Sequence, residues 1–181
     1  MTLTNIADPY GQETADWGPP DHPFYKTNWQ LNITFNNQPN FIPLPIAQMD
    51  LTLYIHSSSS SPSPSSSISI PPSSISTNNH YYSNHSFIYP LAYSSLPSIT
   101  LNKNETKTLS SLFHIDYAAP TSNLSDPIFA QLYNACGPHL INSPPALNMS
   151  LQITFHLLHY LWSSTVDVYP TGGSGLICPT D

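Results

Sequence analysis

Two short motifs in the second half of the chain have the spacing of metal ligands. They are Cys136-Gly-Pro-His139 and His156-Leu-Leu-His159, and thiolate and imidazole are ligands that zinc prefers. The two histidines, however, fall in a segment whose pattern favours a β-strand, and side chains an odd number of positions apart in a strand point to opposite faces. We therefore expect histidines that are exposed or hydrogen-bonded, with no metal site and no cofactor.

Nucleophilic and acid–base catalysis lack a recognisable arrangement of residues. The chain has no Gly-X-Ser-X-Gly motif, and Gly172-Gly-Ser-Gly175 lies where a hairpin turn is expected. Asp116, Asp126 and Asp167 fall in different expected elements, so no pair of carboxylates is indicated. A serine-rich chain with eight histidines will contain accidental Ser-His pairs. The sequence predicts a protein that is not an enzyme.

The two cysteines, Cys136 and Cys178, could form one disulfide. A bridge closing a loop of roughly 40 residues would contribute about 3 to 4 kcal/mol. Two buried free thiols are an equally good interpretation while the compartment is unknown.

Five Asn-X-Ser/Thr sequons are candidate glycosylation sites: Asn32, Asn84, Asn104, Asn123 and Asn148. A chain this rich in Asn, Ser and Thr would contain roughly three or four by chance. The sequons therefore favour an extracytosolic domain without establishing one.

Charge is scarce, which excludes one class of partner. Only 7% of the residues are charged, and the basic residues are Lys26, Lys103 and Lys107. With no Arg and a net charge of -7, the chain has almost nothing with which to follow a phosphate backbone. We expect no nucleic-acid partner.

Membrane segments are not indicated either. No run of about 18 apolar residues occurs, as a membrane-spanning helix would need. The residues from Met1 to Asp8 have neither a basic start nor an apolar core, so we expect no secretory signal there.

Three segments alternate apolar and polar residues, which is typical of strands with one buried face. They run from Leu147 to Trp162, from Trp29 to Asn36, and from Ala47 to His56. The first segment read as a helix would have no apolar stripe. Each apolar face needs a second sheet to cover it.

The rest of the chain supplies shorter pieces. A Ser/Pro-rich stretch at 57–79 predicts a flexible inserted loop, because it has too few apolar residues to compensate for the entropy of ordering. A polar cap, an early proline and a final glycine predict a short helix between Ser125 and Gly137. We expect further strands, with a bulge in the third of them, near 87–89, 96–101, 106–117, 165–169 and 176–178.

These elements predict an all-β fold: one antiparallel immunoglobulin- or fibronectin-like sandwich with one short helix and the Ser/Pro-rich insertion. We place an irregular lead-in at residues 1–26 and the sandwich at 27–181. Its polar faces could bind a glycan or a partner protein, but any sandwich with few charges must present such a surface. If a glycan binds, the loops Asn36 to Asn40 and Gly172 to Gly175 are the expected contacts.

The order of the pieces resembles the late embryogenesis abundant group 2 family, and within it the plant harpin-induced-like and nonrace-specific disease resistance-like branch. The resemblance rests on Trp29-Gln-Leu-Asn-Ile-Thr-Phe leading into the turn at Gln38-Pro39-Asn40, on Leu96-Pro97 and Asn104-Glu-Thr106 in the middle segment, and on a terminal strand ending in Cys178. It covers the layout from about Thr27 to Cys178.

The resemblance implies a seven-stranded sandwich, no enzymatic activity, and a role in stress or defence at the extracytosolic side of the plasma membrane, with an unknown protein or cell-wall partner. Most of that branch carry a transmembrane helix ahead of the sandwich, and no such helix precedes Trp29 here. Gln38 also replaces the first residue of the family's Asn-Pro-Asn turn. The alternative is a soluble, cytoplasmic protein that protects other molecules during dehydration.

Overall fold

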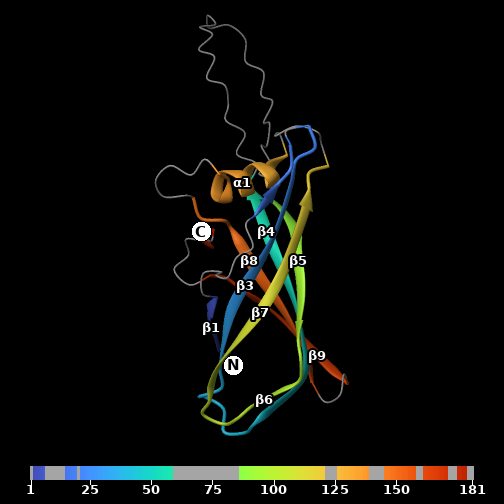
Figure 1. Cartoon of the computed structure of the whole chain (residues 1–181). Helices are drawn as coiled ribbons and strands as arrows, with labels where there is room; N and C mark the ends of the chain where they lie inside the picture. Colours follow the sequence, from blue (N-terminus) through green and yellow to red (C-terminus); the bar gives the residue numbers. More distant parts are fainter. Residues whose placement is uncertain are drawn as a thin grey trace, which may run out of the picture.

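The computed structural model describes residues 2–6, 15–19, 21–58, 86–120, 126–138, 145–157, 161–170 and 175–178. Two antiparallel sheets pack face to face and one short helix lies at one end (Figure 1). The elements in chain order are β1 (Thr2–Ile6), β2 (Asp16–Trp17), β3 (Phe24–Asn36), β4 (Leu44–Ser58), β5 (Ser86–Leu96), β6 (Ile99–Leu101), β7 (Thr106–Ala118), α1 (Pro127–Cys136), β8 (Met149–Leu157) and β9 (Trp162–Val168). The predicted all-β sandwich with one short helix is confirmed.

Sheet A is built around β3. Strand β7 pairs with β3 from Phe24 opposite Ala118 to Asn36 opposite Thr106, without a register shift. The short strands β1 and β2 also pair with β3. Residues 1–26 are therefore not the predicted irregular lead-in, because they contain β1, β2 and the start of β3. The Gly and Pro residues of this stretch interrupt the sequence pattern and hide these strands.

Sheet B has the order β5-β4-β8-β9, and β6 pairs with the beginning of β4. The ladder between β4 and β5 shifts register between Leu53 and Tyr54, next to Pro90. Proline has no N–H to donate, so a bulge is where a sheet tolerates it inside a strand. The bulge predicted between 106 and 117 is wrong: β7 is regular, and Leu112 simply points outward with 60% of its surface exposed.

The core lies between the sheets and is made by one parity of each long strand. Phe35, Leu53 and Ile153 are completely buried, as the alternation predicts. Phe35 of sheet A meets Phe155 of sheet B edge to face, with ring centroids 6.2 Å apart. The predicted buried faces of the three long strands are confirmed except at Ala47. The ladder between β4 and β8 shifts register between Ile46 and Gln48, so Ile46 is buried and Ala47 is only half-buried.

Two predicted boundaries differ from the structure. The strand expected to run from Leu147 to Trp162 ends at Leu157, and Trp162 begins β9. The end of the alternation at Leu158 marks this break. At the C-terminus, the expected last strand is reduced to one bridge, in which Leu147 and Leu176 exchange both backbone hydrogen bonds.

Turns and caps follow their local sequence. The side chain of Asp126 caps α1 by accepting from the N–H of Phe129, and the helix ends before Gly137. In the Asn-rich turn after β3, the buried Asn37 side chain donates to the carbonyls of Leu101 and Asn102 at 3.2 and 2.8 Å. This amide joins two turns at the end of the sandwich away from α1 (Figure 1).

Residues 59–85 and 171–174 lie outside the described residues, and with them most of the predicted insertion at 57–79 and the turn ahead of Gly175. Ser57 and Ser58 belong to β4, and the next described strand is β5. Within the described part of the chain, no helix is long and apolar enough to cross a membrane.

Candidate functional site

The outward-facing side of sheet B carries polar and aromatic side chains from all four of its long strands. We call it the B face. Cross-strand partners share a face, so the ladders place the following residues on it: Gln48, Asp50, Thr52, Tyr54, His56, Ile88, Pro90, Tyr93, Ser95, Ser150, Gln152, Thr154, His156, Ser163, Thr165 and Asp167. Tyr169 continues the outward parity of β9 after the buried Val168.

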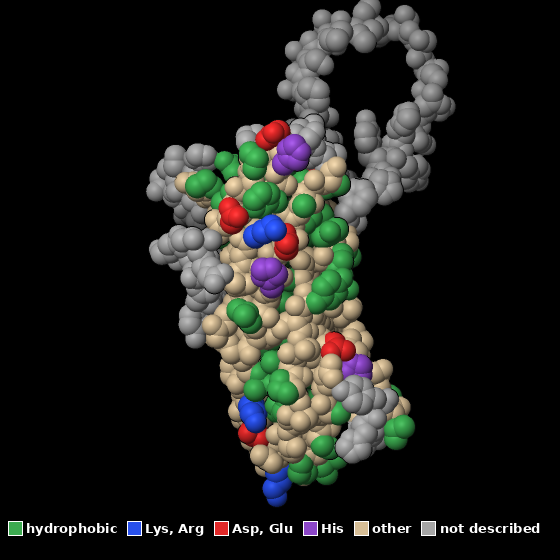
Figure 2. Space-filling view, turned by 45° about the vertical axis from the view of Figure 1, so that its right-hand side comes forward, with side chains coloured by type: hydrophobic (Ala, Val, Ile, Leu, Met, Phe, Trp, Pro, Cys, Tyr) green, Lys and Arg blue, Asp and Glu red, His purple; other side chains and the backbone are tan. Residues whose placement is uncertain are grey.

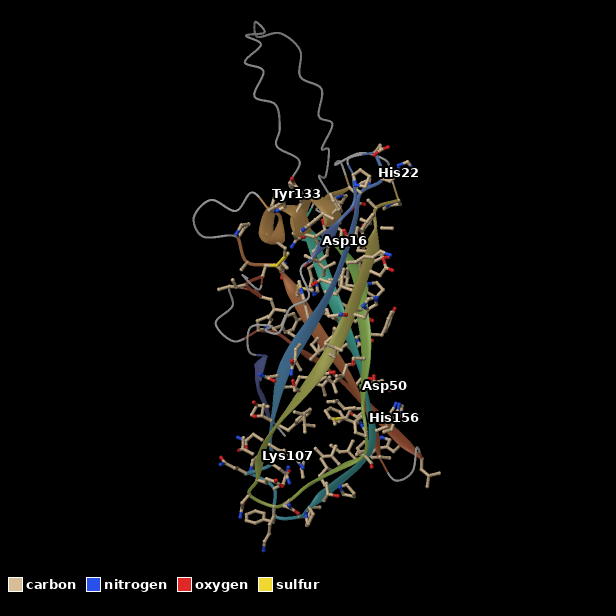
Figure 3. All side chains as sticks on the ribbon, viewed as in Figure 1. Asp16, His22, Asp50, Lys107, Tyr133 and His156 are labelled. Atoms are coloured by element: carbon tan, nitrogen blue, oxygen red, sulfur yellow. A yellow bond between two sulfur atoms is a disulfide. The ribbon has the colours of Figure 1, made fainter. Side chains whose placement is uncertain are left out.

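A carboxylate and a histidine meet at one end of the B face. Nε2 of His156 on β8 lies 2.7 Å from Oδ2 of Asp50 on β4, and the Gln48 amide donates to Oδ1 of Asp50 at 2.7 Å. Figure 3 shows Asp50 and His156 side by side. The hydrogen bond from His156, and a second one from Gln48, lower the pKa of Asp50 below its usual value. The carboxylate therefore keeps its charge in mildly acidic solution.

Neighbouring polar side chains on this face bond to one another across strands. Gln152 donates to Asp167 at 3.0 Å, and the hydroxyls of Thr154 and Thr165 lie 3.1 Å apart. Tyr54 donates weakly to Gln152 at 3.5 Å. These bonds orient the side chains, while Asp167 and Thr165 remain exposed to solvent.

Aromatic rings cross the other end of the B face from edge to edge. Tyr93 on β5 is 67% exposed and Tyr169 after β9 is 61% exposed, with Tyr54 and His56 between them on β4. The rings of His56 and Tyr169 are 6.3 Å apart and tilted by 36°. We call Tyr93, Tyr54, His56 and Tyr169 the aromatic row.

Among the described residues, His56 and Ser150 form a Ser-His pair of the kind that such a sequence contains by chance. Nε2 of His56 and Oγ of Ser150 are 2.7 Å apart, and Ser150 is only 5% exposed. Among the described residues, no carboxylate hydrogen-bonds the other ring nitrogen of His56. The arrangement can stack, donate and accept hydrogen bonds, and it lacks the third group that orients the base of a triad.

The metal-ligand motifs do not come together in the described structure. The sulfur of Cys136 is bonded to another cysteine, and His139 and His159 lie outside the described residues. His156 points outward toward Asp50. Within the described ranges, no group of three His, Cys, Asp or Glu side chains could hold a metal ion.

The described sequons occupy different parts of the surface. Asn32 lies half-buried on the outward side of sheet A, which we call the A face and which also carries Lys26, Asn28, Gln30, Thr34, Thr108, Ser110, Leu112, His114 and Asp116. Asn104 is exposed in the turn after β6, where its φ of 57° is left-handed. Asn148 is exposed one residue before β8, and Asn84 and Asn123 lie outside the described residues.

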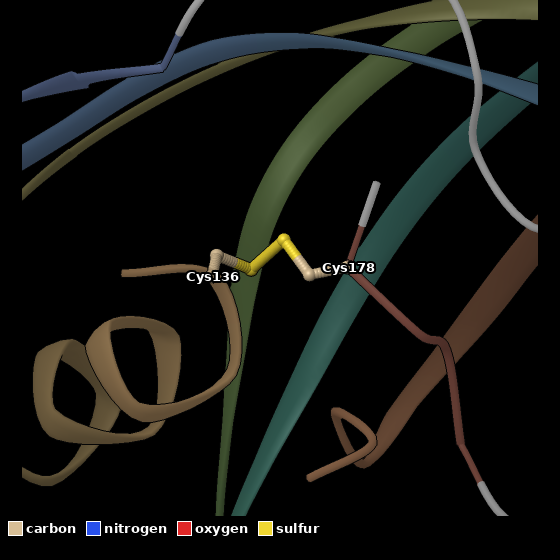
Figure 4. The surroundings of a disulfide bond; sticks show 2 residues. All are labelled: Cys136 and Cys178. Atoms are coloured by element: carbon tan, nitrogen blue, oxygen red, sulfur yellow. A yellow bond between two sulfur atoms is a disulfide. The ribbon is translucent and has the colours of Figure 1, made fainter. Parts of the chain in front are cut away.

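Cys136 and Cys178 form a disulfide (Figure 4). Their Cα atoms are 5.3 Å apart, within the ordinary range for a bridge. The bond ties the end of α1 to the segment whose Leu176 pairs with Leu147. Of the two interpretations left open by the sequence, the structure has the disulfide.

Sequence reasoning expected ligand contacts in the loops and missed the aromatic row. Tyr54 was visible as an aromatic residue on the polar parity of a predicted strand, which is a usable signal. Tyr93 and Tyr169 carried no such signal, because their place beside Tyr54 and His56 depends on how four strands pair.

The strands and sheets of the structure define an all-β sandwich. Comparisons with known proteins assign no family to the chain. No family model matches the chain, and no curated protein matches it. Among solved structures it is similar to the sporulation control protein Spo0M of Bacillus subtilis, with 9% identity and a TM-score of 0.30, over 99% of this chain and 51% of that one. The chain thus spans about half the length of Spo0M, and the likeness is too low to inform function.

Proposed function

We propose that this chain is a non-catalytic β-sandwich protein that acts in stress or defence on the extracytosolic side of the plasma membrane, by binding a partner through its surface. The family resemblance from Thr27 to Cys178 suggests the biological role. The observation that carries the extracytosolic assignment is the Cys136–Cys178 disulfide. Disulfides persist in secreted and cell-surface proteins and are rare in the reducing cytosol.

The surface supports binding more than catalysis. The charged side chains are few in the view of Figure 2, where uncharged polar groups and backbone dominate. Polar side chains of the B face hydrogen-bond to one another across strands, and these bonds hold them in fixed orientations that suit the recognition of a ligand. The serine bonded to His56, Ser150, is almost completely buried.

The test uses native material from the source organism. Thiol labelling before and after reduction counts free cysteines, and peptide mass spectrometry after enzymatic deglycosylation reports which sequons were modified. We expect no free thiol and a glycan at the exposed Asn104. Two free thiols together with unmodified sequons would overturn the extracytosolic assignment and favour the cytoplasmic protective protein.

Removing the bridge tests its contribution to stability. The double variant Cys136→Ser, Cys178→Ser opens a loop with a sequence separation of 42 and should lower the free energy of unfolding by about 3 to 4 kcal/mol. Urea unfolding of the oxidised wild type and the variant measures this. Equal midpoints would mean that the bridge is not needed to hold the end of the chain.

A further inference from the structure

We infer that the B face binds a neutral polysaccharide chain that lies across the strands, with its sugar rings on the aromatic row. This inference deepens the proposed function and rests on it, because a polysaccharide partner requires an extracytosolic protein. It names the ligand class and the face that the proposed function leaves open.

The aromatic row offers stacking surfaces on β5, on β4 and just after β9. Tyr93 pairs with Thr52 on β4, next to Tyr54, and Tyr169 reaches the ring of His56 from beyond β9. Neighbouring strands are about 4.8 Å apart, so the row crosses the width of a sheet. A sugar ring has an apolar face of C–H groups that packs on an aromatic side chain. A row of rings across the sheet therefore fits an extended polymer better than a single small molecule.

Hydrogen-bonding groups adjoin the aromatic row. Gln152 and Asp167 lie in the same cross-strand register as Tyr93, which runs Tyr93, Thr52, Gln152, Asp167. They are already bonded to each other at 3.0 Å, and a carboxylate has further acceptor positions on its two oxygens. Sugar hydroxyls are donors, so an exposed and oriented carboxylate is a suitable acceptor for them.

Charge separates neutral from acidic polysaccharides. Asp50 and Asp167 lie on the B face, which has neither Lys nor Arg. The three lysines of the chain lie elsewhere: Lys26 on β3, Lys107 on β7 and Lys103 in the turn before β7. Figure 3 shows Lys107 away from Asp50 and His156. An anionic polymer would meet two carboxylates and no cation, so the face is complementary to an uncharged chain.

The probes are cellohexaose, laminarihexaose and mannohexaose as neutral oligosaccharides, with oligogalacturonate as the anionic comparison. Each is titrated into the oxidised full chain by NMR and by calorimetry. We expect at least one neutral oligosaccharide to bind, with shifted resonances at Tyr54, Tyr93, Gln152 and Tyr169, and no binding of the anionic one.

Variants assign the site. Tyr93→Ala and Tyr169→Ala should each weaken binding about threefold to tenfold, the range expected for one lost aromatic contact. The matched control is Trp162→Ala, since Trp162 is 59% exposed but lies on the inward parity of β9, off the B face. All three side chains are exposed, so each variant should fold. The control should bind like the wild type.

Several results would overturn the inference. These are no binding of any neutral oligosaccharide at millimolar concentration, tighter binding of the anionic oligomer, or equal losses in the Trp162→Ala control. Oligosaccharide-independent capture of a protein that is lost in Tyr93→Ala would assign the B face to a protein partner instead. An intact disulfide without oligosaccharide binding would overturn this inference and leave the proposed function standing. Free thiols in the native protein would overturn the proposed function even if an oligosaccharide binds in vitro.

Discussion

The A face and the B face begin from the same pattern and end as different surfaces. On both, alternate residues of long strands point outward and bond across the ladder, as in Thr34 with Thr108 on the A face and Thr154 with Thr165 on the B face. The A face adds an ion pair between Lys26 and Asp116 and the sequon at Asn32.

The B face adds tyrosine rings and a histidine-bound carboxylate, whereas the A face carries mainly Asn, Gln, Ser and Thr, with Leu112 and His114. A glycan at Asn32 would cover part of the A face and leave the aromatic row open, while one at Asn148 would border His56. The buried parity decides the fold, and the outward parity decides which chemical groups each sheet offers to solvent. Inward substitutions should therefore affect both sheets alike, and outward ones should affect them differently.

The largest expected effect is on the shared interior. Leu31→Ala in sheet A and Leu53→Ala in sheet B each empty a completely buried site and should each lower the free energy of unfolding by about 2 to 5 kcal/mol. Urea unfolding measures both. The outward neighbours Gln30→Ala and Thr52→Ala serve as controls and should cost under about 1 kcal/mol. If Leu53→Ala lowered the free energy of unfolding much less than Leu31→Ala, sheet B would be loosely packed, and the two sheets would not share one equally packed interior.

Alkaline pH should affect sheet A in particular. Burial raises the pKa of Tyr25 to about 12, and burial together with the 2.8 Å hydrogen bond to Asp126 raises the pKa of Tyr117. Both tyrosines point inward from sheet A. A raised pKa means that the folded protein holds the proton more tightly, so this stability is complete below pH of about 10 and is lost as the pH rises toward 12.

Tyr117→Phe tests this dependence. The variant should lose about 0.5 to 1.5 kcal/mol at neutral pH with the hydrogen bond, and its stability should fall less steeply between pH of about 10 and 12 than that of the wild type. Unfolding curves across this range measure the slope. Ile33→Val is the control, because it costs a similar amount and has no titrating group. An unchanged slope in Tyr117→Phe would exclude Tyr117 as its source.

The smallest effects belong to single charges on the two outward faces. Asp116 and Lys26 are about half exposed and 3.1 Å apart, so Asp116→Asn should cost about 0 to 1 kcal/mol and less in high salt. Asp50 has a lowered pKa, so its contribution is present above pH of about 4 and is lost as the pH falls through that lowered value.

Asp50→Asn should therefore flatten the acid part of the stability curve more than Asp116→Asn does. Urea midpoints from pH 6 down to pH 3 provide the measurement, with the two variants as controls for each other. If the urea midpoint fell equally steeply with pH in both variants, the carboxylates of the two faces would not differ in their contribution to acid stability.

Much of the fold was predictable because period-two alternation is a local signal. In β3 the alternation predicts a buried face at Trp29, Leu31, Ile33 and Phe35, whatever these residues pack against. The two ends of α1 are likewise indicated by Asp126, Pro127 and Gly137. The strands β1 and β2 could not be found this way, because their lengths of five and two residues are too short to show a period. Both strands also form only by pairing with β3.

The candidate site was predictable only in part. Tyr54 and His56 could be placed on an outward parity from the sequence alone, as could the alternatives for Cys136 and Cys178. The partners of these residues could not, because Tyr93 and Tyr169 are distant in sequence and a shift of one residue in either ladder would turn their rings to the other face.

The alternating pattern of the chain fixes which side chains are buried and requires two stacked sheets, since apolar residues at every second position can be removed from water only against a second sheet. The Cys136–Cys178 disulfide, the hydrogen bond from His156 to Asp50 and the gathering of four rings on one face follow from the tertiary structure alone. Those are contacts between segments far apart in the chain, and their formation depends on strand order and register, which no local pattern encodes.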